Sequence, residues 1–174
     1  MRVLKTITFR YDPREDRILA GINLGHSEAW SSWLTRRLVL ALLERAPEFI
    51  ASTSVLAKQA PAAVRGELVA FERDAAIAKT AKAMTPTPTD ALKTSTTTAD
   101  LAKQLTISSQ GDRFRMELQG ESGHGAVAML ARAELQRIFQ MLETEVAKAA
   151  WLGAPVKPPD VTVAEKNTPK PVRH

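Results

Sequence analysis

The spacing of apolar residues changes several times along the chain, and each change predicts a different element. Residues 3–11 alternate apolar and polar positions and contain many β-branched and aromatic side chains, a pattern typical of a half-buried strand. Residues 12–16 form a turn sequence with a proline between acidic residues. Alternation then resumes from Arg17 to about Leu24. These stretches together predict a β-hairpin.

The next apolar segment, Ala29–Leu34, has two interpretations. It forms a third short strand, or Ser27 caps a helix that places Trp30 and Trp33 on one apolar face. We favour the strand, because the comparable segment 126–130 follows glycines and its pattern is extended.

Helical spacing begins after Thr35, a suitable N-cap, and predicts a helix to about Ala46. Pro47 then either kinks this helix or begins a second one. Residues 62–84 are rich in alanine and predict an amphipathic helix of about 20 residues. We expect its narrow apolar stripe to pack on the sheet or on another subunit. The stripe consists of Val64, Leu68, Phe71 and Ala75.

Much of the pattern in residues 16–46 occurs a second time in residues 112–142. Each copy opens with Asp-Arg, continues with alternating apolar positions, and passes through a Leu-x-Arg triplet into a helical pattern. The last helix is expected from near Arg132 to about Leu152. The fold class predicted is α+β, with two similar β-β-(β)-α units. Their antiparallel sheets merge under a cover of helices, and an alanine-rich helix lies between the units.

These elements predict a single domain over residues 1–152, followed by a proline-rich, basic and extended tail. A Thr/Pro-rich stretch is expected to form a linker. The parts are unit one (1–60), the connecting helix (61–84), the linker (85–100), unit two (101–152) and the tail (153–174).

Composition narrows the classes of function. The absence of cysteine excludes disulfides and thiolate chemistry. The longest apolar run, residues 38–43, is too short to cross a bilayer, and residues 1–5 lack a signal-peptide core. We therefore expect a cytoplasmic protein with no membrane contact.

The net charge of +5 suggests phosphate binding, but the excess is spread along the chain. Basic and acidic groups number 8 and 6 in residues 1–50, 6 and 5 in 51–100, 6 and 6 in 101–150, and 4 and 2 in 151–174. Binding to nucleic acid is therefore the alternative and not the first interpretation.

Candidate chemistry is sparse. The glycine-rich stretch 120–125 lacks the lysine and hydroxyl of a phosphate loop and is interpreted as a tight turn. His26 and His124 follow glycines in equivalent turns and have no fixed partner in the sequence. The carboxylates of residues 12–16 suit a solvated turn. We expect no enzyme activity, cofactor, metal or small-molecule substrate.

Six residues are candidates for an interface. Trp30, Trp33 and Trp151 either close the core or anchor a partner. The arginines begin helices, where their charge opposes the helix dipole. They are expected to pair with a carboxylate of another strand or subunit, or with a polyanion. These are Arg36, Arg37 and Arg132.

The sequence therefore predicts a non-enzymatic structural or protein-interaction subunit of a larger assembly. We expect residues 85–100 and 153–174 to contact partners, with self-association. The alternative is an accessory protein that binds nucleic-acid phosphates through arginine and lysine.

Overall fold

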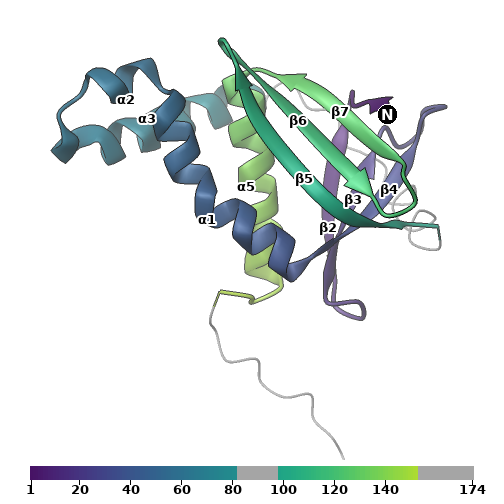
Figure 1. Cartoon of the computed structure of the whole chain (residues 1–174). Coiled ribbons are helices and arrows are strands. Elements are labelled where there is room, and N and C mark those ends of the chain that lie inside the picture. Colours follow the sequence, from purple (N-terminus) through teal and green to yellow (C-terminus); the bar gives the residue numbers. More distant parts are fainter. Residues whose placement is uncertain (82–97, 153–174) are drawn as a thin grey trace, which may run out of the picture.

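The computed structural model describes residues 1–81 and 98–152, which form an open seven-stranded sheet with four α-helices, a mixed α+β fold (Figure 1). The strands are β1 (Arg2–Val3), β2 (Ile7–Asp12), β3 (Arg17–Ile22), β4 (Trp30–Thr35), β5 (Asp100–Gln110), β6 (Arg113–Gly120) and β7 (Gly125–Leu130). The helices are α1 (Arg36–Thr53), α2 (Val55–Gln59), α3 (Arg65–Ala81) and α5 (Arg132–Lys148), with a 3₁₀ turn at Ala62–Val64.

The strand order is β1-β7-β6-β5-β4-β3-β2, so two antiparallel meanders lie side by side. They meet at β4 and β5, which run parallel and pair Ser32 with Asp100 and Trp33 with Leu101. The expectation of a purely antiparallel sheet is therefore wrong at this junction and at the parallel β1–β7 pair. Parallel neighbours need a long connection, and here α1, α2 and α3 lie between β4 and β5 in the sequence.

The short N-terminal strand connects the two ends of the sheet. β1 pairs with β7 at one end, and only residues 4–6 separate it from β2 at the other. The buried side chain of Asn23 holds this crossing: it accepts hydrogen bonds from the backbone of Lys5 (2.8 Å) and Thr6 (3.1 Å) and donates one to Val3 (2.8 Å). The predicted strand 3–11 is therefore broken at residues 4–6.

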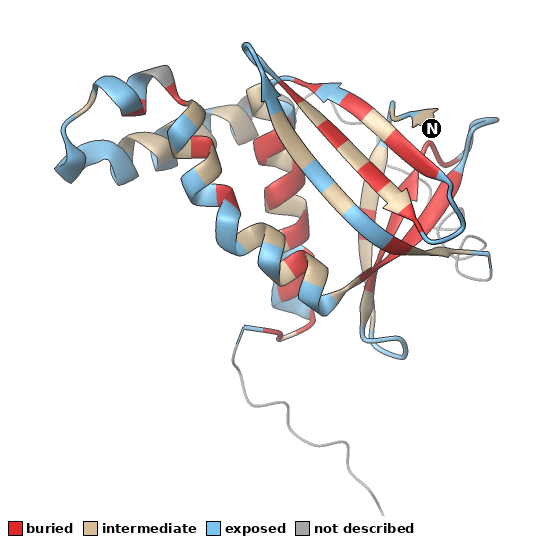
Figure 2. Cartoon of the chain, in the orientation of Figure 1, coloured by how far each residue is buried: buried red, intermediate tan, exposed pale blue. Residues whose placement is uncertain are grey.

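The main core lies between the sheet and the helices α1 and α5 (Figure 2). Alternate residues of β3 and β6 point into it, which the period-two pattern had indicated. A smaller cluster of Leu19, Leu24 and Trp33 covers part of the opposite face. The last helix buries the side chains expected of it: Leu135, Ile138, Phe139, Leu142 and Val146.

Helix α1 runs through Pro47 without a break and ends at Thr53. The predicted N-cap is confirmed, since the Thr35 hydroxyl accepts a hydrogen bond from the backbone of Leu38 (3.3 Å). Ser54 then caps α2 through the backbone N–H of Ala57 (3.0 Å).

The apolar stripe of the connecting helix does not pack on the sheet, which was one of its two expected partners. Val64 and Phe71 of the expected stripe are exposed, at 42% and 71%. Instead, Arg73 forms an ion pair with Glu143 of α5, and Glu72 accepts a hydrogen bond from Ser54 (3.0 Å). Val69 packs against the core on the same side of α3, and Phe71 faces outward.

The predicted linker 85–100 and tail 153–174 fall mostly outside the described residues. Asp100 is the first residue of β5, so the linker was predicted to end too late. Within the two described ranges, no helix has the length and hydropathy needed to cross a membrane.

Candidate functional site

All three tryptophans are buried within the chain, as the core interpretation requires. Trp30 lies in the main core and Trp33 packs with Leu19 on the opposite face of the sheet. Trp151 contacts Tyr11 edge to face, with ring centroids 5.8 Å apart, and its indole N–H donates to Asp16 (2.8 Å). None of them offers a large exposed surface to a partner.

Two of the arginines bind the ends of helices. Arg36 begins α1 and donates to the backbone carbonyl of Trp151, which follows α5 (3.0 Å). Arg132 begins α5 and donates to the carbonyls of Ile50 (3.2 Å) and Thr53 at the end of α1. The charge of Arg132 therefore stabilises the negative end of α1, whereas Arg36 binds a carbonyl three residues beyond the end of α5. Arg37 is exposed.

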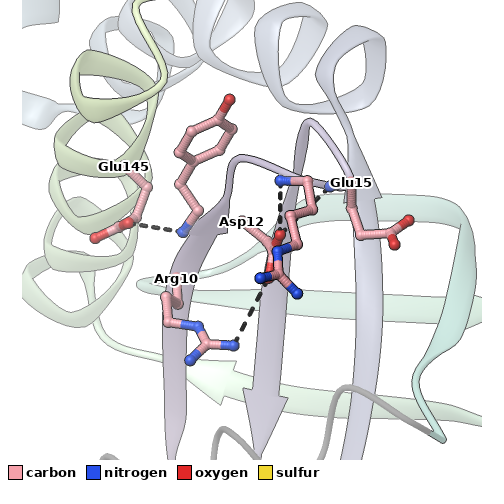
Figure 3. A network of polar contacts seen from close by, with 6 residues as sticks. Arg10, Asp12, Glu15 and Glu145 are labelled. Atoms are coloured by element: carbon pink, nitrogen blue, oxygen red, sulfur yellow. Dashed lines mark hydrogen bonds and ion pairs between the residues drawn. The ribbon is translucent and has the colours of Figure 1, made fainter.

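The edge strand β2 is held by a carboxylate from α5 (Figure 3). Glu145 is buried and accepts a hydrogen bond from the backbone N–H of Tyr11 (2.8 Å). Burial raises the pKa of the Tyr11 hydroxyl, and the hydrogen bond that it donates to Asp16 adds to the effect. This contact covers part of an edge that would otherwise be open to another strand.

The glycine-rich turn is closed by a residue that the sequence did not single out. Asp100 accepts hydrogen bonds from the hydroxyl of Ser122, from the backbone of Ser122 (3.3 Å) and from the backbone of Leu101 (2.8 Å). Burial alone raises the pKa of Asp100, but these hydrogen bonds and the nearby His124 outweigh it and lower the pKa. The carboxylate therefore stays ionised and clamps the turn.

The same cluster contains the residue types of a hydrolase triad in a different order. His124 Nδ1 lies 3.0 Å from Ser122 Oγ, and the serine stands between the imidazole and the carboxylate. A catalytic histidine lies between serine and carboxylate, where it takes the serine proton. Here the hydroxyl proton points to Asp100 instead, an arrangement suited to holding a turn.

His26 is exposed in its own turn, between β3 and β4. Among the residues that the structure describes, no three histidine or carboxylate side chains gather closely enough to hold a metal ion.

The most distinctive open surface is one edge of the central strand β5. This strand has 11 residues, but only Asp100 and Leu101 pair with β4. Beyond them, Lys103–Gln110 bonds through its backbone to β6 alone, as far as the described residues show. We call this stretch the β5 edge. It contains one charged residue, Lys103, whereas exposed edges are usually protected by several charges or by proline.

An apolar groove lies beside the β5 edge. Its volume is about 360 Å³, and it is lined by α1 and β5 with Phe139 of α5. Leu105, Thr106 and Ile107 all touch it, although consecutive side chains of a strand point to opposite faces. A cavity that contacts all three must lie against the edge of the strand. The α1 side is formed by Leu38, Ala41, Leu42, Arg45, Ala46 and Phe49.

The sequence contained part of the signal for this site. Leu105 and Ile107 alternate with polar residues, a pattern typical of a strand. The number of β5 residues left without a partner on β4 depends on the register between two strands about 70 residues apart. The local pattern of apolar residues does not determine this register.

Comparison with known proteins gives no further assignment: no family model matches the chain, and neither the curated proteins nor the solved structures contain a match.

Proposed function

We propose that this chain is a protein-interaction subunit that binds an extended polypeptide segment by strand addition at the β5 edge. The observation that supports this is the location, directly beside an apolar groove, of an eight-residue edge with which no described strand pairs. Neither feature alone identifies a partner class. Together they match the requirements of strand addition, in which backbone bonds give affinity and pockets for alternate side chains give specificity.

The edge supplies the backbone bonds. Alternate residues of Lys103–Gln110 direct their N–H and C=O groups away from β6, which gives an incoming strand roughly four residues to pair with. A partner with alternating apolar side chains places them in the groove against Leu42, Phe49 and Ile107, which are half-buried. Burial of these apolar surfaces contributes about 25 cal/mol per Å² to the free energy of binding.

The arrangement of the chain as two related units belongs to the same proposal. Each unit has three antiparallel strands followed by a long helix. Arg36 and Arg132 occupy corresponding positions, and each binds a backbone carbonyl at the end of the other unit's helix or just beyond it. We infer an internal duplication in which the second unit kept the longer strand and thereby acquired the open edge.

Phosphate binding is a weaker candidate. Arginines do lie on the sheet face away from the helices, but Arg115 forms an ion pair with Glu117 (2.6 Å) and Arg10 faces Asp12 at 4.0 Å. A phosphate-binding surface needs cations that are free of carboxylates. Binding to duplex and single-stranded DNA across a salt titration tests this alternative, because phosphate binding weakens steeply as salt rises.

Selection from a random library of nine-residue peptides on the full chain tests strand addition. We expect the selected peptides to alternate apolar residues and to lack proline. Ala41 is exposed on α1 and lines the groove. Ala41→Glu should therefore weaken binding of a selected peptide at least tenfold, whereas Ala147→Glu, at an exposed alanine of α5, should leave it unchanged. Equal binding by both variants would refute the proposed site.

A further inference from the structure

We propose that the segment that occupies the β5 edge is residues 160–168 of the same molecule. This inference rests on the strand addition proposed above and adds the identity of the bound segment. It makes the groove an internally occupied site, so that any external strand must compete with the chain's own C-terminal segment.

The sequence of this segment suits an added strand. A strand that pairs through its backbone needs N–H groups, which proline lacks. Residues 160–168 are the longest proline-free stretch after Gly153, and their nine residues match the eight of the β5 edge. Val161 and Val163 alternate with the β-branched Thr162, as a strand with one apolar face requires.

The length of the chain allows the segment to reach the groove. Trp151 is fixed to Arg36, the first residue of α1, through a hydrogen bond of 3.0 Å. The groove is lined by the following turns of the same helix, from Leu38 to Phe49, within about 20 Å of that point. Residues 153–159 contain three prolines, and seven residues in an extended conformation span about 22 Å.

The charges of the segment and of the groove are also complementary. The lining of the groove includes Arg45, and Lys103 begins the β5 edge. The two acidic residues after Gly153 are Asp160 and Glu165, and both lie in the proposed segment. The segment also contains Lys166, so its net charge is −1, opposite in sign to Arg45 and Lys103.

Hydrogen exchange of the full chain tests the proposal. Val161→Asp with Val163→Asp places charges against the apolar groove, and Val156→Asp with Val172→Asp is the matched control, since it makes the same changes outside residues 160–168. We expect amide exchange in Lys103–Gln110 to become roughly tenfold faster in the first variant and to stay unchanged in the control. Equal exchange rates in the wild type and in both variants would overturn the proposal.

The concentration dependence distinguishes one molecule from two. Protection that persists on tenfold dilution, in a chain that light scattering finds monomeric, supports occupation by the same molecule. If dilution removes both the dimers and the protection from exchange, a second copy supplies the strand. This result would overturn the assignment.

The same variants separate this inference from the proposed function. If library peptides bind the wild type and the Val161→Asp/Val163→Asp variant equally, and exchange is unaffected, strand addition stands and the internal segment is excluded. If the internal segment occupies the edge, removing its valines should tighten peptide binding about tenfold. If no peptide binds either protein and exchange does not change, both proposals fail.

Discussion

Arg36 and Arg132 each begin one long helix, and each donates hydrogen bonds to carbonyl oxygens at the end of the other helix or just beyond it. Both guanidinium groups also lie over an aromatic ring, 6.0 Å from the centroid of Trp151 and 5.3 Å from that of Phe114. Helices α1 and α5 are therefore joined at both ends, which fixes one wall of the groove relative to the sheet.

This pairing predicts the effect of removing a guanidinium group. Arg132→Met keeps an unbranched apolar chain but loses the bonds to Ile50 and Thr53, and leaves carbonyl groups at the end of α1 without their charged donor. We expect a loss of about 2 kcal/mol in the free energy of unfolding, measured in urea. Arg37→Met, on the exposed side of α1, should change it by less than about 0.5 kcal/mol. Equal losses in the two variants would contradict the assigned role.

Two phenylalanines test the orientation of α3. Phe71 is 71% exposed, and Phe139 of α5 is 5% exposed. Phe139→Ala should cost about 3–5 kcal/mol of unfolding free energy, as expected for a cavity in a core. Phe71→Ala should cost less than about 0.5 kcal/mol. A large cost at Phe71 would mean that this side chain is buried, contrary to its exposed position on α3.

The close contact between Asp100 and Gly120 predicts a paired substitution effect. A Cβ atom on residue 120 would overlap Asp100 Oδ2 and would lie 3.0 Å from the ring of Trp30. Gly120→Ala should therefore cost about 1–3 kcal/mol. In an Asp100→Ala background the same change should cost less, because the carboxylate is gone and only the Trp30 contact remains. Thermal unfolding of the four proteins of this cycle measures the difference, and additive costs would contradict the contact.

The lowered pKa of Asp100 predicts a dependence on pH. Its ordinary value is 3.8, and hydrogen bonds to the ionised form hold the folded value below this. The stabilisation is therefore fully present above the unfolded pKa and is lost as the pH falls through the folded pKa. Urea midpoints of the wild type and of Ser122→Ala should differ at neutral pH and converge in acid. A constant difference across this range would contradict the assignment.

Much of the fold was predictable because it follows from local spacing. The hairpin of β2 and β3, the third strand β4 and the buried stripe of α5 agree with the periods of two and 3.6 in their residues. Thr35 was identified as a cap because its hydroxyl satisfies a backbone donor within the same turn. Such features depend on neighbours in the sequence.

The rest depends on contacts between distant residues. Periodicity did not predict which face of α3 is buried, because that face contains polar residues whose partners are distant in the sequence. Arg73 pairs with Glu143 of α5, and Glu72 accepts a hydrogen bond from Ser54. It also did not predict that Arg36 and Arg132 would bind carbonyl groups, since the expected partners were carboxylates or a polyanion. The β5 edge was not recognised for the same reason, because it arises from the unequal lengths of two strands.

The crossing at residues 4–6 has a consequence for the order of folding. β1 pairs with β7, and Tyr11 bonds to Glu145, 134 residues further along the chain. Contacts of such sequence separation are slow to form, because the loop between them must close first. During synthesis β2 can pair with β3 at once, whereas β1 must wait until β7 has been made, so β1 is expected to be among the last strands to join.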